Sequence, residues 1–288
     1  MRKATGKAAG KKQAGAAKAS KTGSSAGTGG AKRITKTASR RRPLKPNQRN
    51  IALILAAGFG SRANLSMPKQ FAIVEGKPVI VHTLETFNNN RQIDEIVVVI
   101  LEGWEAVVDR YIENYGLDKV KRLVTGGVSG QESIRNGMHY LRKNYRPDDI
   151  IIIHDSVRPL VTDEIINSNI SGVLLNGNAV TVIPATEALL YCDNSTTSER
   201  IIDRATTLRT QTPQSLRLRD LIRIHEEADR RGIHNSVATC TLLVELGETV
   251  HFAKGDNSNF KITTGSDIRL FAAYLKSKEE YTMPKAKD

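Results

Sequence analysis

Two glycines and two cations lie close together near residue 60. The stretch LAAGFGSR holds Gly58, Gly60 and Arg62, and the triplet PKQ that follows it holds Lys69. The apolar run Ile51–Leu55 comes directly before them and is typical of a buried strand. Glycines after a strand let the backbone approach an anion closely, with its N–H groups turned toward it. The pattern therefore predicts a loop that grips a nucleoside triphosphate, and hence an enzyme.

Other types of glycine-rich loop could explain the same residues. Gly58, Gly60 and Ala63 also fit the dinucleotide fingerprint G-x-G-x-x-A, which would indicate a dehydrogenase. That fingerprint requires a helix to begin at the loop, and Pro68 would fall in its second turn, where a proline costs roughly 3 kcal/mol. A P-loop is excluded because no Gly-Lys-Ser/Thr follows at the required spacing. A glycine loop with a purely structural purpose stays open.

The charge of the chain is concentrated at its N-terminus. Residues 1–50 hold 15 of the 43 lysines and arginines and no aspartate or glutamate, which leaves 28 basic residues against 30 acidic ones in the remainder. Residues 1–48 have almost no large apolar side chains, so we expect a disordered basic tail. Such a tail would attract nucleic acid or anionic surfaces, which leaves a nucleic-acid-binding protein as an alternative; a merely solubilising extension is also open. Residues 281–288 are expected to be a flexible C-terminus.

The rest of the chain alternates short apolar runs with amphipathic stretches. This alternation predicts an α/β fold, with a Rossmann-like and mainly parallel sheet forming one domain over residues 49–280. Residues 185–210 are polar and interrupt the pattern, so we expect an excursion from the main sheet. The expected strands are Ile51–Leu55, Ile96–Leu101, Arg122–Thr125, Ile150–His154, Ala179–Ile183 and Val250–Ala253. The expected helices are Val79–Phe87, Trp104–Tyr115, Gln131–Lys143, Thr162–Leu175, Leu216–Arg231 and Ser266–Lys278, with a helix start at Thr162 and a stop at Gly232.

Several protein classes are disfavoured. The sequence has no run of 18 apolar residues and no secretory signal, so we expect no membrane span and a cytoplasmic location. Cys192 and Cys240 are far apart and form neither a disulfide framework nor a metal cluster.

Four further segments could contribute to a site at the carboxyl ends of the strands, where ligands bind such sheets. Asp155 follows the run Ile150–His154 and could hold Mg²⁺ against phosphate oxygens, whereas a histidine at position 154 is more often a structural group. The other segments are the turn Gly126-Gly127 with Ser133 after it, a compact polar turn Thr212-Pro213-Gln214, and the extended stretch NFKIT around Lys261.

The order of these motifs resembles one family of enzymes. The series LAAGxGxR, PKQ, GG with a following serine, HDSVRP, TPQ and NxKIT resembles the cytidylyltransferases that activate sugar-alcohol phosphates with CTP, over about residues 50–278. These enzymes act on 2-C-methyl-D-erythritol 4-phosphate or on D-ribitol 5-phosphate. Ser156-Val157, Gly103-Trp104, Cys240 and Ala253-Lys254-Gly255 favour the ribitol 5-phosphate branch, and the spacing from Arg62 to Pro68 favours the methylerythritol branch.

The resemblance implies a role for individual residues. Arg62, Lys69 and Lys261 match the catalytic cations around the triphosphate, and Asp155 matches the carboxylate that holds Mg²⁺. Arg204, with Thr212 on the acceptor side, matches an arginine that reaches the acceptor phosphate from the partner subunit. The implied nucleotide-binding positions are Ala56, Ala57, Gly58, Gly60, Gly127 and Ser133.

The resemblance further implies a homodimer in which residues 185–210 form the dimerisation arm. It implies transfer of CMP from CTP to D-ribitol 5-phosphate, giving CDP-ribitol and pyrophosphate. The alternative acceptor is 2-C-methyl-D-erythritol 4-phosphate, the substrate of isoprenoid biosynthesis. The chain departs from the family pattern at Ala188, Val237, Ala238, Val128 and Gly130, positions on the acceptor and base sides.

Overall fold

A computed structural model of the chain describes residues 48–58 and 67–280, with the side chains of 278–280 left out. The predictions for residues 1–47 and 281–288, and those for Gly60 and Arg62, lie outside the described residues.

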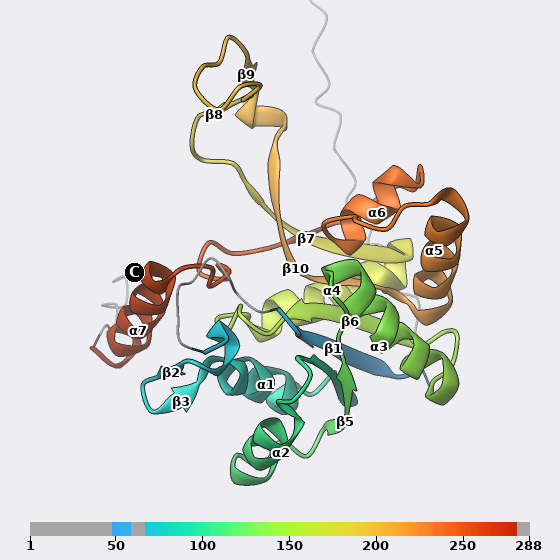
Figure 1. Cartoon of the computed structure of the whole chain (residues 1–288), viewed down its shortest axis with the longest axis vertical. Coiled ribbons are helices and arrows are strands. Elements are labelled where there is room, and N and C mark those ends of the chain that lie inside the picture. The colour runs from blue at the N-terminus through green and yellow to red at the C-terminus, as the bar shows by residue number, and fades with distance from the viewer. Residues whose placement is uncertain (1–47, 59–66, 281–288) are drawn as a thin grey trace, which may run out of the picture. The chain divides into compact units, whose positions relative to one another are not determined.

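The described chain folds around one seven-stranded sheet with the order β11-β7-β10-β6-β1-β4-β5. Strand β10 runs antiparallel to its neighbours β6 and β7, and every other pairing in the sheet is parallel. The mainly parallel α/β sheet predicted from the sequence is thus confirmed (Figure 1). The seven strands are β1 (Asn50–Ala56), β4 (Glu95–Ile100), β5 (Val120–Thr125), β6 (Ile150–Asp155), β7 (Asn178–Pro184), β10 (Leu208–Arg217) and β11 (Phe252–Lys254). Two short hairpins lie apart from it, β2 (Ile73–Val74) with β3 (Lys77–Pro78), and β8 (Leu189–Leu190) with β9 (Ile201–Ile202).

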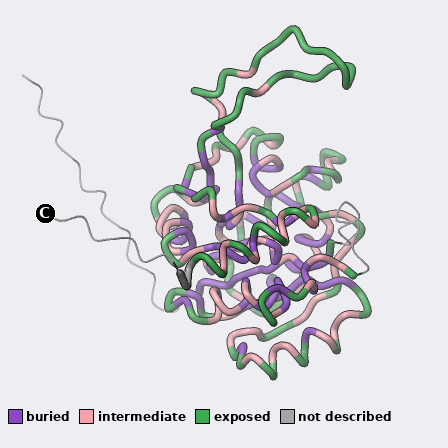
Figure 2. The backbone as a smooth tube through the Cα atoms, turned by 90° about the vertical axis from the view of Figure 1, so that its left-hand side faces the viewer, coloured by how far each residue is buried: buried purple, intermediate pink, exposed green. Residues whose placement is uncertain are grey.

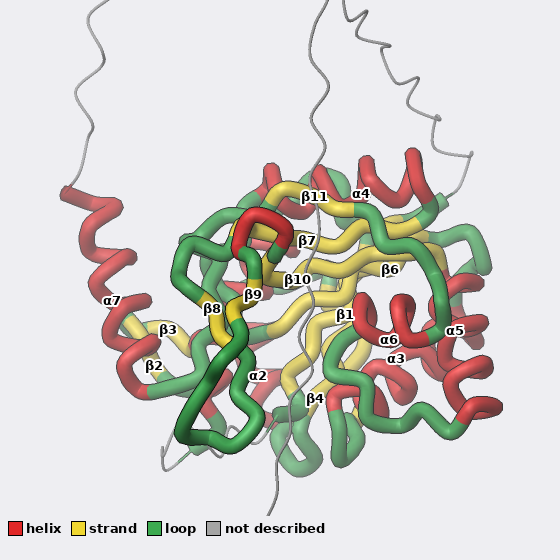
Figure 3. The backbone as a smooth tube through the Cα atoms, turned by 90° about the horizontal axis from the view of Figure 1, so that it is seen from above, coloured by secondary structure: helices red, strands yellow, loops and turns green. Residues whose placement is uncertain are grey.

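Helices cover both faces of the sheet because alternate strand residues point to opposite sides. One core packs β1, β4 and β6 against α1, α2 and α4, and a second core packs the other face against α3, α5 and α6. Figure 3 shows α4 on one side of the strands and α3, α5 and α6 on the other. The helices are α1 (Val79–Asn89), α2 (Glu105–Asn114), α3 (Gly130–Asn144), α4 (Asp163–Asn176), α5 (Leu218–Arg231), α6 (Thr239–Glu245) and α7 (Gly265–Glu280).

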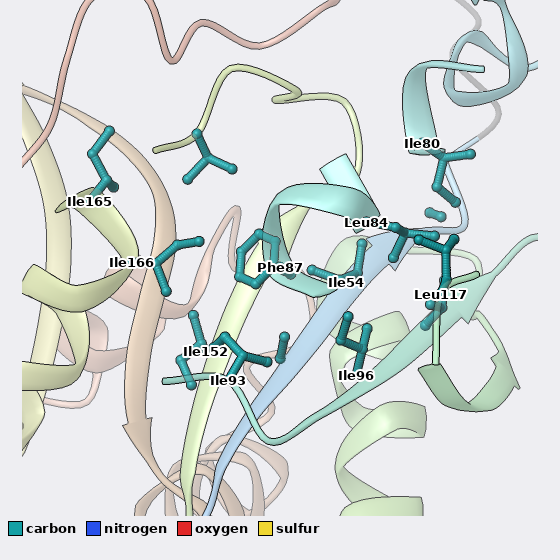
Figure 4. Packing of buried hydrophobic residues seen from close by; sticks show 14 of the residues in the cluster. Ile54, Ile80, Leu84, Phe87, Ile93, Ile96, Leu117, Ile152, Ile165 and Ile166 are labelled. Carbon is teal, nitrogen blue, oxygen red and sulfur yellow. The ribbon is translucent and has the colours of Figure 1, made fainter. Parts of the chain in front are cut away.

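The first core is built almost entirely from branched aliphatic side chains. Ile54 of β1 and Ile152 of β6 have no exposed surface, and Leu84 and Phe87 of α1 pack against the same face (Figure 4). A strand with isoleucine or valine at nearly every position is stable only when both faces are covered. The central strands are therefore held rigidly, and their carboxyl ends can position a site.

Helix ends follow the signals in the sequence. The Thr162 side chain accepts a hydrogen bond from the N–H of Ile165 and caps α4. Gly232 ends α5 with φ of 69°, a left-handed conformation that glycine adopts without strain. Both predicted helix boundaries are confirmed. No described helix is long and apolar enough to cross a bilayer.

The polar excursion at 185–210 leaves the sheet between β7 and β10 and carries the hairpin β8–β9. Figure 1 shows this hairpin at the far end of the two long strands, and Figure 2 shows it almost wholly exposed. Its exposed apolar side chains include Leu190, Tyr191 and Ile201.

Several elements differ from the sequence prediction. The helix predicted over Leu216–Arg231 begins only at Leu218, because Leu216 and Arg217 pair with Ile151 and Ile150 of β6 as part of β10. The segment Thr212-Pro213-Gln214, expected to be a polar turn, lies inside β10, where the pairing with β7 shifts register between Thr210 and Gln214. Helix α6 was not predicted, because its 7 residues are too few to show a helical period.

Candidate functional site

A cleft of about 550 Å³ opens at the carboxyl ends of β1 and β6, beside the first turn of α3. The two strands are neighbours in register, with Leu55 opposite Asp155, so the loops that follow them lie side by side. The cleft is lined by Leu55, Ala56, Ala57, Gly58, Lys69, Gln70, Gly127, Val128, Ser129, Gly130, Ser133, Asp155, Ser156, Val157 and Lys261.

Lys69 enters the cleft from the 3-10 turn η2 (Lys69–Phe71). The backbone of this turn is closed by hydrogen bonds from Phe71 N to the Pro68 carbonyl and from Ala72 N to the Lys69 carbonyl. The Phe71 ring is buried and stacks on Trp104, with ring centroids 4.0 Å apart and planes 4° from parallel. The lysine is therefore presented from a short, well-anchored turn.

The opposite wall is a turn that leads into α3. The Gly127 N–H donates to Ser133 Oγ at 3.1 Å, and the Val128 N–H donates to Glu132 Oε2 at 2.9 Å. A Cβ at Gly126 would lie 2.2 Å from the Ala57 Cβ, so glycine alone allows this turn to approach the β1 loop. The first turn of α3 thus faces the cleft, and a helix N-terminus stabilises an anion there.

Asp155 and Lys261 form the charged centre of the cleft. Lys261 Nζ lies 3.1 Å from Asp155 Oδ2, and Arg158 Nε lies 3.1 Å from the same oxygen. The Ile262 N–H donates to the Val157 carbonyl at 2.9 Å, which holds the strand-like stretch around Lys261 against the end of β6. Burial alone would raise the pKa of Asp155, but Lys261 and Arg158 lower that pKa to about 2. The carboxylate is therefore ionised at neutral pH.

A single ionised carboxylate in a nucleotide cleft fits Mg²⁺, which takes one or two carboxylates and completes its shell with phosphate oxygens and water. The described residues hold no group of three or more histidine, cysteine, aspartate or glutamate side chains that could bind a metal without a substrate. Asp155 would therefore hold Mg²⁺ only together with the triphosphate.

His154 and Thr212 lie beneath this centre. His154 is fully buried; its Nε2 is 3.2 Å from the Arg158 carbonyl, and its Nδ1 is 3.1 Å from Thr212 Oγ1. Thr212 Oγ1 also accepts a hydrogen bond from the Asp155 N–H at 3.0 Å. These contacts give His154 the structural place expected from the sequence. They bind the Thr212 hydroxyl to the buried His154 ring and to the backbone of the cleft residue Asp155.

Burial lowers the pKa of His154 and of His225 to about 4. Unfolded histidines have a pKa near 6.5, so the unfolded chain binds more protons between pH 6.5 and pH 4, and the free energy of unfolding falls as the pH falls through this window. We expect each histidine to remove about 2 kcal/mol by pH 5, and the thermal midpoint to drop by on the order of 10 °C between pH 7.5 and pH 5.

A pair of variants checks the cause. Neither ring nitrogen of His225 has a hydrogen-bond partner among the described residues, so His225→Leu should keep the fold. It should also reduce the decrease of the thermal midpoint between pH 7.5 and pH 5. His234 is largely exposed, and His234→Asn should leave the profile unchanged. A thermal midpoint that is constant down to pH 5 in the unmodified protein would contradict this account.

The predicted site residues divide into three groups. Eight of them line the cleft, and Gly60 and Arg62 lie outside the described residues. Arg204 lies on the arm, where its guanidinium donates to the Thr186 carbonyl at 3.3 Å, and Thr212 lies under the cleft as described above. The eight in the cleft are Ala56, Ala57, Gly58, Lys69, Gly127, Ser133, Asp155 and Lys261.

Sequence reasoning did not single out Gln70 or the Ser129–Glu132 pair. Ser129 Oγ accepts a hydrogen bond from the Glu132 N–H at 3.1 Å and caps α3. The pattern Ser-x-x-Glu before a helix is a recognised capping signal and could have marked this turn. The contacts of Gln70 depend on the folded chain and have no such signal.

A family model described as IspD, 2-C-methyl-D-erythritol 4-phosphate cytidylyltransferase, matches residues 50–277. The chain belongs to this family. It is therefore a cytidylyltransferase, a nucleotidyltransferase enzyme, and the resemblance seen in the motifs is confirmed.

Relatives within the family carry two names. A ribitol-5-phosphate cytidylyltransferase of Lacticaseibacillus paracasei is 40% identical over 230 residues, which is 79% of this chain and 98% of the relative. A Vibrio parahaemolyticus protein of the same name is 38% identical over 80% of this chain and 97% of its own. A 2-C-methyl-D-erythritol 4-phosphate cytidylyltransferase of Clostridium acetobutylicum is 33% identical over 79% of this chain and 97% of its own.

Solved structures show the same fold. The 4-diphosphocytidyl-2C-methyl-D-erythritol synthase of Anaerococcus prevotii superposes with a TM-score of 0.68 at 25% identity, covering 80% of this chain and 96% of that one. The 2-C-methyl-D-erythritol 4-phosphate cytidylyltransferase of Thermus thermophilus gives a TM-score of 0.64 at 26% identity, covering 80% of this chain and all of that one.

Proposed function

We propose that this enzyme transfers the CMP group of CTP to D-ribitol 5-phosphate, giving CDP-ribitol and pyrophosphate. The choice of acceptor is supported by the relatives named ribitol-5-phosphate cytidylyltransferase. They are 34–40% identical to this chain over almost their whole length. The methylerythritol acceptor remains the second candidate, supported by the family description and by a relative at 33% identity.

The reaction is an in-line displacement at phosphorus. An oxygen of the acceptor phosphate attacks the α-phosphorus of CTP, and the bond from that phosphorus to the oxygen bridging to the β-phosphate breaks. Pyrophosphate leaves with the electron pair. No protein nucleophile is needed, so the work of the site is to bring two anions together and to stabilise the charge that spreads over the phosphoryl oxygens.

The residues of the cleft are suited to this work. The first turn of α3 offers backbone N–H groups to the nucleotide, and Ala57 and Gly58 after β1 line the same cleft. Lys69 and Lys261 supply positive charge from two separate segments of the chain that line one cleft. Both cations reduce the repulsion between the acceptor phosphate and the triphosphate.

Mg²⁺, when bound with the nucleotide, neutralises part of its charge and polarises the phosphoryl group under attack. Asp155 would hold it through a carboxylate that is ionised at all physiological pH values. Lys261, whose Nζ lies 3.1 Å from Asp155 Oδ2, would place its positive charge beside the same phosphates.

We further propose that the enzyme is a homodimer with shared sites. Arg204 is not among the described residues that line the cleft of its own chain, and it lies on an arm whose apolar side chains are exposed. An arm seated on a second copy would cover those side chains and carry Arg204 to the partner's acceptor phosphate. Mixed dimers, described in the Discussion, test this arrangement.

A parallel assay tests the acceptor. Release of pyrophosphate from CTP is measured with D-ribitol 5-phosphate and with 2-C-methyl-D-erythritol 4-phosphate at equal concentrations, and a reaction without acceptor gives the background. We expect kcat/KM to be at least about 100-fold higher for ribitol 5-phosphate. The methylerythritol phosphate has one hydroxyl fewer and a methyl branch, so it would leave polar groups of a site built for ribitol 5-phosphate unpaired. The reverse preference would assign the enzyme to the methylerythritol reaction.

A further inference from the structure

Gln70 is a buried carboxamide that joins the two segments forming the triphosphate side of the cleft. The residue is 1% exposed, and its Nε2 lies 2.8 Å from the Ala56 carbonyl and 3.0 Å from the Gly58 carbonyl. A carboxamide nitrogen carries two N–H groups, so it can donate to both oxygens at once. The first carbonyl belongs to the last residue of β1 and the second to the segment that directly follows the strand.

The same residue is covalently next to Lys69. Since η2 spans only three residues, a displacement of the Gln70 side chain moves the lysine backbone with it. The far side of the turn is fixed by the stack of Phe71 on Trp104. The turn is thus held on one side by an aromatic contact and on the other by two hydrogen bonds to the loop itself.

We infer that Gln70 is a positioning residue that sets the distance between Lys69 and the segment Ala56–Gly58 at the end of β1. This inference rests on the proposed function, because it assumes that Lys69 acts on the triphosphate. Loss of the donor would leave two carbonyl oxygens without their partner and would let the turn and the loop move apart. A misplacement of about 1 Å can lower the rate of an enzyme by about 100-fold.

Gln70→Met removes the donor and keeps a side chain of similar length. We expect kcat/KM for CTP to fall about 100-fold and CTP binding, measured by calorimetry without acceptor, to weaken in parallel. Gln70→Glu keeps the shape but places acceptor oxygens against two carbonyls, so its loss should be at least as large. It also serves as the second variant where the methionine side chain impairs folding.

A matched control removes an equivalent buried amide elsewhere. Asn169 of α4 is fully buried and donates from Nδ2 to the Ile165 carbonyl and to Thr181 Oγ1, away from the residues that line the cleft. Asn169→Leu should lower the thermal midpoint at least as much as Gln70→Met and leave kcat/KM within about twofold of the unmodified protein. An equal loss of activity in both variants would assign the Gln70 effect to stability.

A double-mutant cycle with Lys69→Ala separates positioning from mere support. If Gln70 acts through Lys69, then Gln70→Met should cost about 100-fold in the unmodified protein but less than about fivefold in the Lys69→Ala background. If the losses in kcat/KM of the two single variants instead multiply in the double variant, the inference is wrong, and the proposed function is unaffected. If Lys69→Ala alone changed neither CTP binding nor turnover, the assumed role of Lys69 would fail, and the inference with it.

Discussion

Replacing Lys69 by alanine is expected to lower kcat/KM by about 100- to 1000-fold while the protein stays folded. This is the typical cost of losing one preorganised charge contact in a transition state. Lys69 is half-buried in the cleft, and its turn is held by backbone hydrogen bonds and by the Phe71–Trp104 stack, which remain when the ammonium group is removed.

The measurement is steady-state pyrophosphate release, with the thermal midpoint as the check on folding. Lys121→Ala is the matched control, since this lysine is exposed on β5 and contacts the Asp118 carbonyl outside the cleft lining. It should keep full activity. Lys69→Arg retains the charge but not the point-like geometry of an ammonium, so we expect partial activity. Turnover of Lys69→Ala near that of the unmodified protein would remove the residue from the mechanism.

The sequence predicted the parallel part of the fold because both faces of those strands are buried. A run such as Ile150–Ile153 can be stable only with apolar cover on each side, and the structure provides it from α1, α4, α3 and α5. The same apolar pattern placed Asp155 and the loop around Gly58 at the ends of strands. Their meeting in one cleft then follows from the topology of parallel sheets.

Strand β10 could not be predicted in the same way, because its first seven residues are mostly polar. Its polar side chains are satisfied by the folded chain: Ser215 Oγ donates to Asn169 Oδ1 at 3.2 Å, and Gln214 Oε1 accepts from the Cys240 N–H at 2.9 Å. These partners are 46 and 26 residues away in the sequence, and no local sequence pattern indicates them.

The same limit applies within the site. The residue types around Lys69 and Asp155 indicated phosphate and metal binding, and the order of the motifs, through their resemblance to a family, added Lys261. The roles of Gln70 and Thr212 depend on which backbone groups lie within 3 Å or so of their side chains after folding. Those distances are set by tertiary packing, and the motifs of a single sequence do not predict them.

Mixed dimers should recover activity when one chain carries Arg204→Ala and the other carries Lys69→Ala. Each variant alone is expected to be nearly inactive. If Arg204 serves the partner's cleft, a mixed dimer has one site with both defects and one site with neither. After random subunit exchange about half of the dimers are mixed, so activity should return to about a quarter of that of the unmodified protein.

A second mixture provides the control, Lys69→Ala with Asp155→Asn. Both of these residues line the cleft of one chain, so every site in that mixed dimer keeps one defect and no recovery is expected. Exchange is verified with differently tagged chains before activity is measured. Recovery in the first mixture and none in the second can arise only when Arg204 and Lys69 of one working site come from different chains. Absence of recovery in both, after verified exchange, would place Arg204 in the site of its own chain or outside the reaction, and the exposed arm would then need another explanation than a shared site.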